Sequence, residues 1–180
     1  MRVTVSGLPG SGTTTLAKYL AKTHGFELIS AGEMFRQLAR ERGMSLAEFG
    51  ALAEKDVSID AMIDVWQKEV AAEKDRIVAE GRLSGWMVED ADLKIWLHAP
   101  IGCRARRIAE RDGTDEYTAR ELALQREECE YTRYLHYYHI DIRDLSRYDL
   151  VLNSELWNPE ALGAIADVAI AALKKKEARS

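Results

Sequence analysis

The sequence predicts an α/β fold in which five parallel strands form one sheet and helices cover both of its faces. Five short apolar runs occur along the 180-residue chain, and long helical patterns separate them. None of these runs shows the alternation of apolar and polar residues that is typical of a half-exposed strand. Buried strands that alternate with helices are typical of a doubly wound parallel sheet.

The predicted strands and the first two helices follow one another in simple order. Strands are expected at residues 3–6, 27–30, 76–80, 93–97 and 149–152. A helix over residues 14–24 has apolar residues at helical spacing and ends at Gly25, and a second over 31–42 ends at Gly43. Glycine commonly ends a helix because it adopts the left-handed conformation without strain.

Two longer helical segments interrupt the alternation of strands and helices. Ser45 and Glu48 have the spacing of a capping box, which predicts a helix to about residue 55, and another helix is expected over 59–73. One crossover helix would suffice there, so the surplus predicts an insertion over one end of the sheet. A second helical segment, residues 101–138, has a charged break at residues 111–113. A final helix is expected over residues 159–174, and it carries lysines at its C-terminal end, as the helix dipole favours.

Composition and charge restrict the class of protein. A chain of this length without a linker or repeat is expected to form a single domain. The net charge of -5 argues against a nucleic-acid-binding protein, and no apolar run approaches the roughly 20 residues that cross a membrane. Cys103 and Cys129 lack metal-like or redox-like spacing, so we expect free thiols and a cytoplasmic location.

A glycine-rich segment, GLPGSGTTT, follows the first predicted strand and leads into the first helix. It matches the phosphate-binding pattern G-x-x-x-x-G-K-[ST] except that Thr13 occupies the lysine position. Thr14 stands at the Ser/Thr position that binds Mg²⁺ beside phosphates. The helix that begins near Gly12 directs its open N–H groups and positive dipole end at the loop, which favours phosphate.

Three further clusters follow predicted strands or lie on a predicted helix. Arg36 lies one helical turn past the second predicted strand, and Glu80 and Arg82 lie at the end of the third predicted strand. These three residues are therefore expected at the ligand-binding edge of the sheet. A carboxylate such as Glu80 can hold the hydration shell of Mg²⁺, and Arg82 can bind phosphate bidentately. Each residue taken alone also fits a solvated surface position.

The last cluster places two arginines and a carboxylate on one face of a helix. Arg126, Glu130 and Arg133 have spacings of four and seven residues. The alternative is a salt-bridge ladder on a solvated helix. A second group, Arg104, Arg106, Arg107 and Arg111, lies upstream. Together these arginines are candidates for the positive charge that the loop lacks, whereas Lys18 is expected to point to solvent.

Taken together, these segments resemble the nucleoside monophosphate kinases, and within them the cytidylate kinases of the short archaeal type. The resemblance extends over residues 2–157. It is carried by ISAGEMFRQLA, AEGRLSGW and REECEYTRY, and by the order and spacing of IDAMIDVWQKE and IDIRDLSRYDLVLNS. It implies a P-loop NTPase fold with a monophosphate-binding insertion at about 31–75 and a lid region at about 101–145.

The resemblance also implies the reaction and its residues. It implies direct in-line transfer of the γ-phosphoryl group of ATP to CMP or dCMP with Mg²⁺, by a monomer that binds neither nucleic acid nor membrane. The loop residues Gly7, Leu8, Pro9, Gly10, Ser11, Gly12, Thr13, Thr14 and Thr15 would hold ATP, with Thr14 and Glu80, through water, at the metal. The residues implied at the acceptor are Ser30, Gly32, Arg36, Asp60, Gly81, Arg82, Glu130 and Arg133, with Arg126, Arg133 and Arg82 acting in catalysis.

The residues that read the base are not defined by any motif. Leu83 replaces an aspartate of bacterial relatives, and Ala61, Val65 and Trp66 replace arginines that archaeal relatives often carry. Asp60, Asp64 and Gln67 are the remaining candidates for contacts with cytosine.

Three other functions stay open from the sequence. One is a kinase for adenylate, uridylate or another phosphate-bearing metabolite. Another is a nucleotide-binding switch, although the N-K-x-D guanine signature of GTPases is missing from the sequence. The third is an interaction module without catalytic activity.

Overall fold

The computed structural model describes residues 1–53 and 55–177, which fold around one sheet. The strands are β1 (Arg2–Gly7), β2 (Glu27–Ser30), β3 (Ile77–Glu80), β4 (Leu93–His98) and β5 (Leu150–Asn153). The helices are α1 (Thr13–His24), α2 (Ala31–Glu41), α3 (Leu46–Ala53), α4 (Val57–Ala72), α5 (Ser84–Met87), α6 (Ile101–Asp112), α7 (Glu116–Tyr138) and α8 (Pro159–Glu177).

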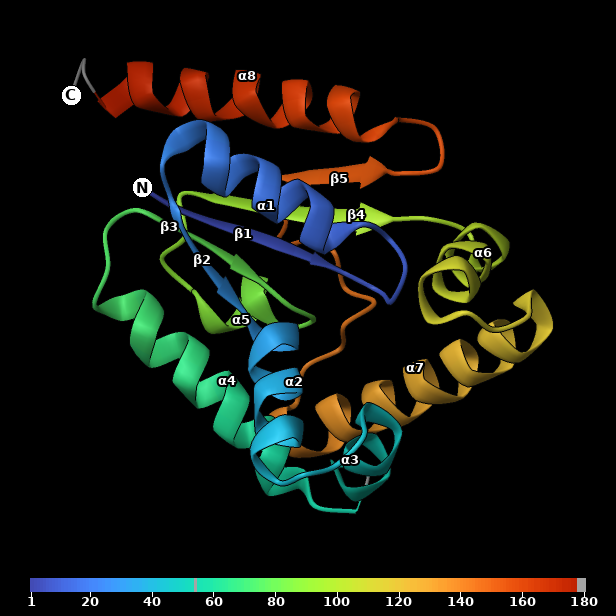
Figure 1. Cartoon of the computed structure of the whole chain (residues 1–180). Coiled ribbons are helices and arrows are strands. Elements are labelled where there is room, and N and C mark those ends of the chain that lie inside the picture. The colour runs from blue at the N-terminus through green and yellow to red at the C-terminus, as the bar shows by residue number, and fades with distance from the viewer. Residues whose placement is uncertain (54, 178–180) are drawn as a thin grey trace.

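The five strands form one parallel sheet, as the sequence predicted, and the structure gives their order as β2-β3-β1-β4-β5 (Figure 1). β1 lies in the centre, with Val3 opposite Val78 of β3 and Leu93 of β4. Because all strands run in the same direction, their carboxyl ends meet at one edge, where β1 ends at Gly7 and β3 at Glu80. This edge is where open α/β sheets bind ligands.

Helices cover both faces of the sheet, and the side chains of β3 show the division. Val78 packs with α1 and α8 on one face, whereas Ile77 and Ala79 pack with α4 on the other. Leu20 of α1 and Ile170 of α8 are completely buried in the first of these clusters. The continuous apolar character of the strands therefore reflects burial on two sides.

Most helix ends agree with the local signals in the sequence. In the predicted capping box, Ser45 Oγ accepts from the N–H of Glu48, and Glu48 Oε2 accepts from the N–H of Ser45. Gly113 has φ 68° and ends α6 where the charged break was predicted. Glu54, within the predicted continuation of α3, lies outside the described residues.

Two predictions about the helices need correction. The short helix α5 was not predicted, because four residues are too few for a helical period to show in the sequence. α4 begins at Val57 rather than at residue 59, because Asp56 caps it by accepting from the N–H of Ser58.

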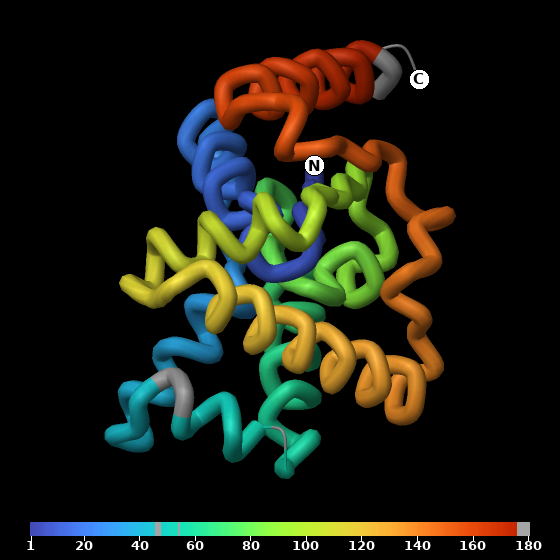
Figure 2. The backbone as a smooth tube through the Cα atoms, turned by 90° about the vertical axis from the view of Figure 1, so that its right-hand side faces the viewer, coloured from blue at the N-terminus to red at the C-terminus, as the bar shows by residue number. Residues whose placement is uncertain are grey.

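The helical segments form two lobes beyond the ligand-binding edge of the sheet. One lobe contains α2, α3 and the start of α4, and the other contains α6 and α7, which lie side by side (Figure 2). A separate cluster around Phe49 and Ile59 fills the first lobe. Within the described residues, none of the helices is long and apolar enough to span a membrane.

Candidate phosphate-transfer site

The glycine-rich segment forms a tight turn between β1 and α1. Gly10 and Gly12 adopt left-handed backbone conformations, with φ 80° and 94°, and the N–H of Ser11 donates to the carbonyl of Leu8 at 3.1 Å. A Cβ at Gly7 would lie 2.5 Å from the carbonyl oxygen of Leu97. Gly12 also begins α1 without a side-chain cap, so the first N–H groups of the helix remain available to an anion.

The buried carboxylate of Glu80 joins the loop to the end of β2. Its Oε1 accepts hydrogen bonds from Thr13 at 2.7 Å and from Thr14 at 3.2 Å, and its Oε2 accepts from Ser30 at 2.6 Å. Thr13, at the lysine position of the pattern, therefore binds this carboxylate. Hydroxyl and carboxylate oxygens are the hard ligands that suit Mg²⁺, so the residues present fit this ion.

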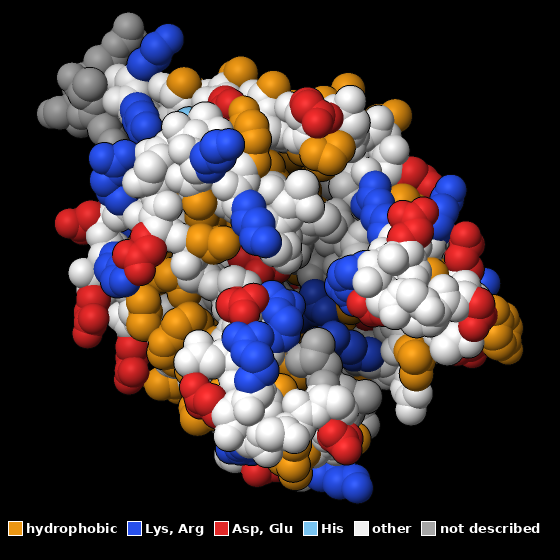
Figure 3. All heavy atoms as spheres, in the orientation of Figure 1, with side chains coloured by type: hydrophobic (Ala, Val, Ile, Leu, Met, Phe, Trp, Pro, Cys, Tyr) orange, Lys and Arg blue, Asp and Glu red, His pale blue; other side chains and the backbone are white. Residues whose placement is uncertain are grey.

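Arginines from three places contact the backbone of the loop. Arg82 donates to the carbonyl of Gly7 at 2.7 Å, Arg104 to that of Pro9 at 3.2 Å, and Arg107 to that of Gly10 at 3.3 Å. Lys and Arg side chains line the hollow between the lobe of α2 and α3 and the lobe of α6 (Figure 3). The positive charge near the loop thus comes from distant segments.

Other members of the upstream arginine group lie away from the loop. Arg111 pairs with its neighbour Asp112, and Arg106 is exposed on α6. The prediction that this group supplies charge to the loop is therefore confined to Arg104 and Arg107. Lys18 is exposed on α1, which confirms that it points to solvent.

A buried ionic cluster connects α7 with the loop. Glu130, whose side chain is 4% exposed, accepts from Arg82 at 2.7 Å through Oε2 and from Arg126 at 2.7 Å through Oε1. Burial alone would raise the pKa of Glu130, but the two arginine charges outweigh it and hold the pKa at about 2. Glu130 is therefore ionised at neutral pH, and it positions both arginines at the ligand-binding edge.

The other predicted acceptor arginines also have carboxylate partners. Nη2 of Arg133 lies 2.7 Å from Oδ2 of Asp60, which links α7 to α4. Arg36 pairs with Glu33 on its own helix at 2.8 Å and remains partly exposed. The structure thus brings Arg82 against the face of α7 that carries Arg126, Glu130 and Arg133, and leaves Arg36 on the opposite lobe.

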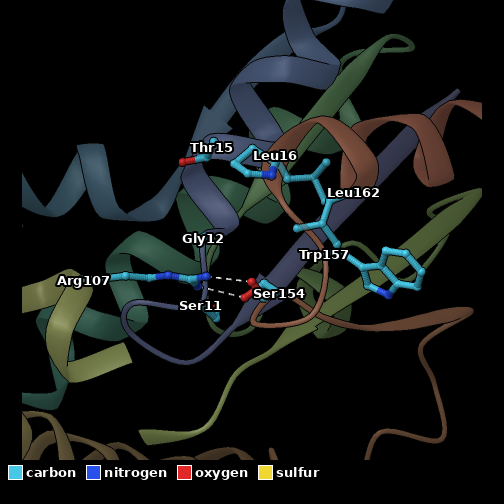
Figure 4. A pocket seen from close by; sticks show the side chains of 9 residues that line it. Ser11, Gly12, Thr15, Leu16, Arg107, Ser154, Trp157 and Leu162 are labelled. Atoms are coloured by element: carbon cyan, nitrogen blue, oxygen red, sulfur yellow. Dashed lines mark hydrogen bonds between the residues drawn. The ribbon is translucent and has the colours of Figure 1, made fainter. Parts of the chain in front are cut away.

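A cavity of about 280 Å³ beside the loop was not predicted from the sequence (Figure 4). Arg107 lines this cavity, and its guanidinium donates to Ser154 Oγ at 3.0 Å and to the carbonyl oxygen of Ser154 at 2.6 Å. The complete lining is Ser11, Gly12, Thr15, Leu16, Arg107, Ser154, Trp157, Pro159 and Leu162. Trp157 forms part of the cavity wall and is 43% exposed.

The prediction that Gln67 contacts a base is wrong. Its side chain is buried, its Nε2 donates to the carbonyls of Ile29 and Glu80, and its Oε1 accepts from Ser84. Gln67 thus holds the ends of β2 and β3 together, both of its N–H donors are used, and it is only 1% exposed. Asp60 and Asp64, on the same helix, face α7 instead.

A phosphate-binding loop on a doubly wound parallel sheet, with arginines gathered opposite it, defines the class of P-loop kinases. Solved structures agree on the fold. Shikimate kinase from Bacteroides thetaiotaomicron superimposes with a TM-score of 0.65 at 14% identity, over 95% of this chain and 98% of that one. A gluconokinase from Sinorhizobium meliloti superimposes with a TM-score of 0.59 at 15% identity, over 97% of this chain and 94% of that one.

The chain belongs to the cytidylate kinase-like family, whose model matches residues 2–156. A cytidylate kinase from Methanoregula boonei is 61% identical over 97% of both chains. A cytidylate kinase from Pyrococcus abyssi is 52% identical over 97% of this chain and 96% of its own. These relatives are archaeal, as the resemblance in the sequence implied.

We expect Glu130→Gln to lower the free energy of unfolding at pH 7 by about 3 kcal/mol, because Arg82 and Arg126 lose the charge that they share. The pKa of Glu130 falls from 4.5 in the unfolded chain to about 2 in the folded one. Its contribution is therefore complete above about pH 4.5 and is lost as the pH falls toward 2. Urea unfolding of both proteins at pH 7, 5 and 3 measures the difference.

Glu33→Gln is the matched control, because Glu33 pairs with Arg36 and Arg40 at the surface. Exposed ion pairs contribute little, so this variant should unfold like the original protein. Equal effects of the two substitutions, or a difference that does not shrink in acid, would contradict the assignment.

Proposed function

We propose that this chain transfers the γ-phosphoryl group of ATP directly to CMP or dCMP, giving ADP and CDP or dCDP. An oxygen of the acceptor phosphate attacks the γ-phosphorus while the bond to the β,γ-bridging oxygen breaks. The single observation that carries the proposal is that one edge of the sheet unites the phosphate loop, Glu80 and the arginines of α7 in a chain that belongs to the cytidylate kinase-like family.

The loop and the adjoining cavity are proposed to bind the phosphoryl donor, ATP. The N–H groups of Gly7–Thr15 and the start of α1 bind the phosphates of ATP, and Thr14 and Glu80, the latter through water, hold Mg²⁺. Mg²⁺ supplies charge neutralisation between the phosphates. The cavity next to the loop receives adenine, which Trp157 and the guanidinium plane of Arg107 can contact.

The arginines are proposed to bind the acceptor phosphate and to stabilise the negative charge of the transition state. Arg36, Arg82 and Arg133, with Ser30, Gly32 and Gly81 nearby, bind the acceptor phosphate, and Arg126 reaches toward the transferred group. In the structure each of these four arginines pairs with a carboxylate. An incoming phosphate competes for the same donors and makes bidentate, charge-assisted hydrogen bonds with them.

Little covalent chemistry is needed for this transfer, because positioning and charge stabilisation supply most of the catalysis. The resemblance implied that Glu130 contacts the acceptor, but both of its oxygens already bind arginines. Its role in the proposed reaction is therefore to orient Arg82 and Arg126. The lobe of α6 and α7 excludes water from the γ-phosphate.

A panel of acceptors tests the proposed function. CMP, dCMP, UMP, AMP, GMP, shikimate and gluconate are each incubated with ATP and Mg²⁺, and ADP and the phosphorylated product are both quantified, so that ATP hydrolysis is distinguished from transfer. We expect CMP or dCMP to have the highest kcat/KM. If neither CMP nor dCMP has a higher kcat/KM than the other acceptors, the proposed substrate is wrong. If the protein only binds GTP and hydrolyses it slowly, a nucleotide-binding switch is favoured instead.

Arg36 and Arg40 provide a matched test of the acceptor site, because both lie on α2 and pair with Glu33. Arg36→Ala should raise the KM for CMP about 10- to 100-fold, the effect of losing a charge-assisted hydrogen bond, with the KM for ATP unchanged. Arg40→Ala should leave both constants as they are. Steady-state kinetics with each substrate varied in turn decides between them, and equal KM values for CMP would exclude Arg36 from the site.

Trp157 and Leu156 provide a matched test of the adenine site. Trp157 lines the cavity, whereas Leu156 is 69% exposed and does not. Trp157→Ala should raise the KM for ATP about tenfold, as expected for a lost contact between a base and an aromatic ring. Leu156→Ala serves as the control. An unchanged KM for ATP in the Trp157 variant would place adenine elsewhere.

A further inference from the structure

Polar groups without hydrogen-bond partners gather at the seam between α4 and α7. Among the described residues, seven buried side-chain nitrogen or oxygen atoms lack such a partner, and three of them, Asp60 Oδ2, Arg133 Nε and Tyr138 Oη, lie at this seam. Asp60 Oδ2 is 2.7 Å from Nη2 of Arg133, in an alignment that makes an ion pair but not a hydrogen bond. Buried polar groups are almost always paired, so this concentration indicates a ligand site.

Asp64 lies in the same seam, one helical turn from Asp60 on the same face of α4. It is half-buried and no arginine or lysine forms an ion pair with it within the described residues. Gln67, almost a turn further along, contacts the end of β3. Asp64 thus lies on α4 between Asp60, which pairs with Arg133, and Gln67, which contacts the end of β3.

The groups that face Asp64 come from both helices. They are Asp60 on α4 and Glu130, Arg133 and Tyr138 on α7. Burial raises the pKa of Asp64 to about 7, Asp60 and Glu130 add to the rise, and Tyr138 and Arg133 oppose it. Asp64 therefore changes its protonation state near neutral pH, unlike Glu130.

We propose that Asp64 accepts a hydrogen bond from the exocyclic amino group of the acceptor's cytosine and thereby determines the preference for cytosine over uracil. This inference rests on the proposed function and extends it to the base. Arg133 binds the acceptor phosphate in that proposal, and its partner Asp60 lies one turn of α4 from Asp64. The ribose of a nucleotide spans the space between a bound phosphate and a base at Asp64.

The chemistry of the two bases explains the discrimination. Position 4 of cytosine carries an amino group that donates to a carboxylate, whereas position 4 of uracil carries a carbonyl oxygen that the same carboxylate repels. A protonated Asp64 is different, because its hydroxyl can donate to the uracil carbonyl, while its carbonyl oxygen still accepts from the cytosine amino group. Discrimination is therefore strongest above the pKa of Asp64 and decreases as the pH falls below it.

Kinetics with two acceptors tests this inference. The ratio of kcat/KM for CMP to kcat/KM for UMP is measured between pH 6 and pH 8.5. Both nucleotides carry the same phosphate, so ionisation of that group cancels in the ratio. We expect the ratio to fall about tenfold from pH 8 to pH 6 in the original protein. Asp64→Asn, whose amide can either accept or donate, should lower the ratio at least about tenfold and remove its pH dependence.

Glu69→Gln is the control, because it makes the same chemical change at an exposed position of α4. It should retain both the ratio and its pH dependence. A purely structural role for Asp64 would reduce activity toward both acceptors equally and leave the ratio unchanged, and that result would overturn the inference. Failure of the original protein to phosphorylate CMP would instead reject the proposed function.

A second measurement needs no variant, in case Asp64→Asn does not fold. Calorimetric titration of the original protein with CMP and with UMP at pH 7, in buffers of different ionisation enthalpy, reports the protons exchanged on binding. CMP should favour ionised Asp64 and release protons relative to UMP, which should favour the protonated form. Equal proton exchange for the two nucleotides would overturn the inference.

Discussion

The carboxylate of Glu130, buried between Arg82 and Arg126, is the interaction on which the arrangement of the site depends. Arg82 also donates to the carbonyl of Gly7, so a continuous chain of hydrogen bonds runs from α7 to the phosphate loop. The protein has a net charge of -5 yet must gather positive charge where phosphates bind. Without a buried anion, Arg82 and Arg126 would repel each other across the cleft.

The loop carries Thr13 in place of the usual lysine, and arginines from distant segments contact its backbone. Thr13 is hydrogen-bonded to Glu80, and the carbonyls of the loop bind Arg82, Arg104 and Arg107. Arg104 also pairs with Glu127, which attaches the loop to α7 a second time. A lysine carries its charge on a flexible stem, whereas a guanidinium that binds a backbone carbonyl is fixed in place.

Three polar residues on one face of α4 show how strongly tertiary neighbours determine a side chain's role. Asp60, Asp64 and Gln67 have the spacing of a single helical face, and the sequence treated them alike. Gln67 meets the carbonyls at the ends of β2 and β3 and becomes part of the core. Asp60 pairs with Arg133, whereas Asp64 forms no ion pair within the described residues, and burial is the main cause of its raised pKa. In the proposed reaction Asp60 thus holds the phosphate-binding Arg133 of α7, whereas Asp64 contacts the base.

The sequence by itself determined the parallel α/β fold, the order of the elements, the loop and the residues that lie at the ends of the strands. These features depend on local chemistry: the spacing of apolar residues, the glycines of the turns and the caps of the helices. The four-residue helix α5 is too short to leave such a pattern. Only the tertiary structure decided which arginines contact the loop, because Arg104 binds the carbonyl of Pro9 across 95 residues and Arg82 binds that of Gly7 across 75. The cavity formed by the loop, Arg107 and Trp157 was also decided only by the tertiary structure, because it arises from the packing of segments that are distant in the sequence.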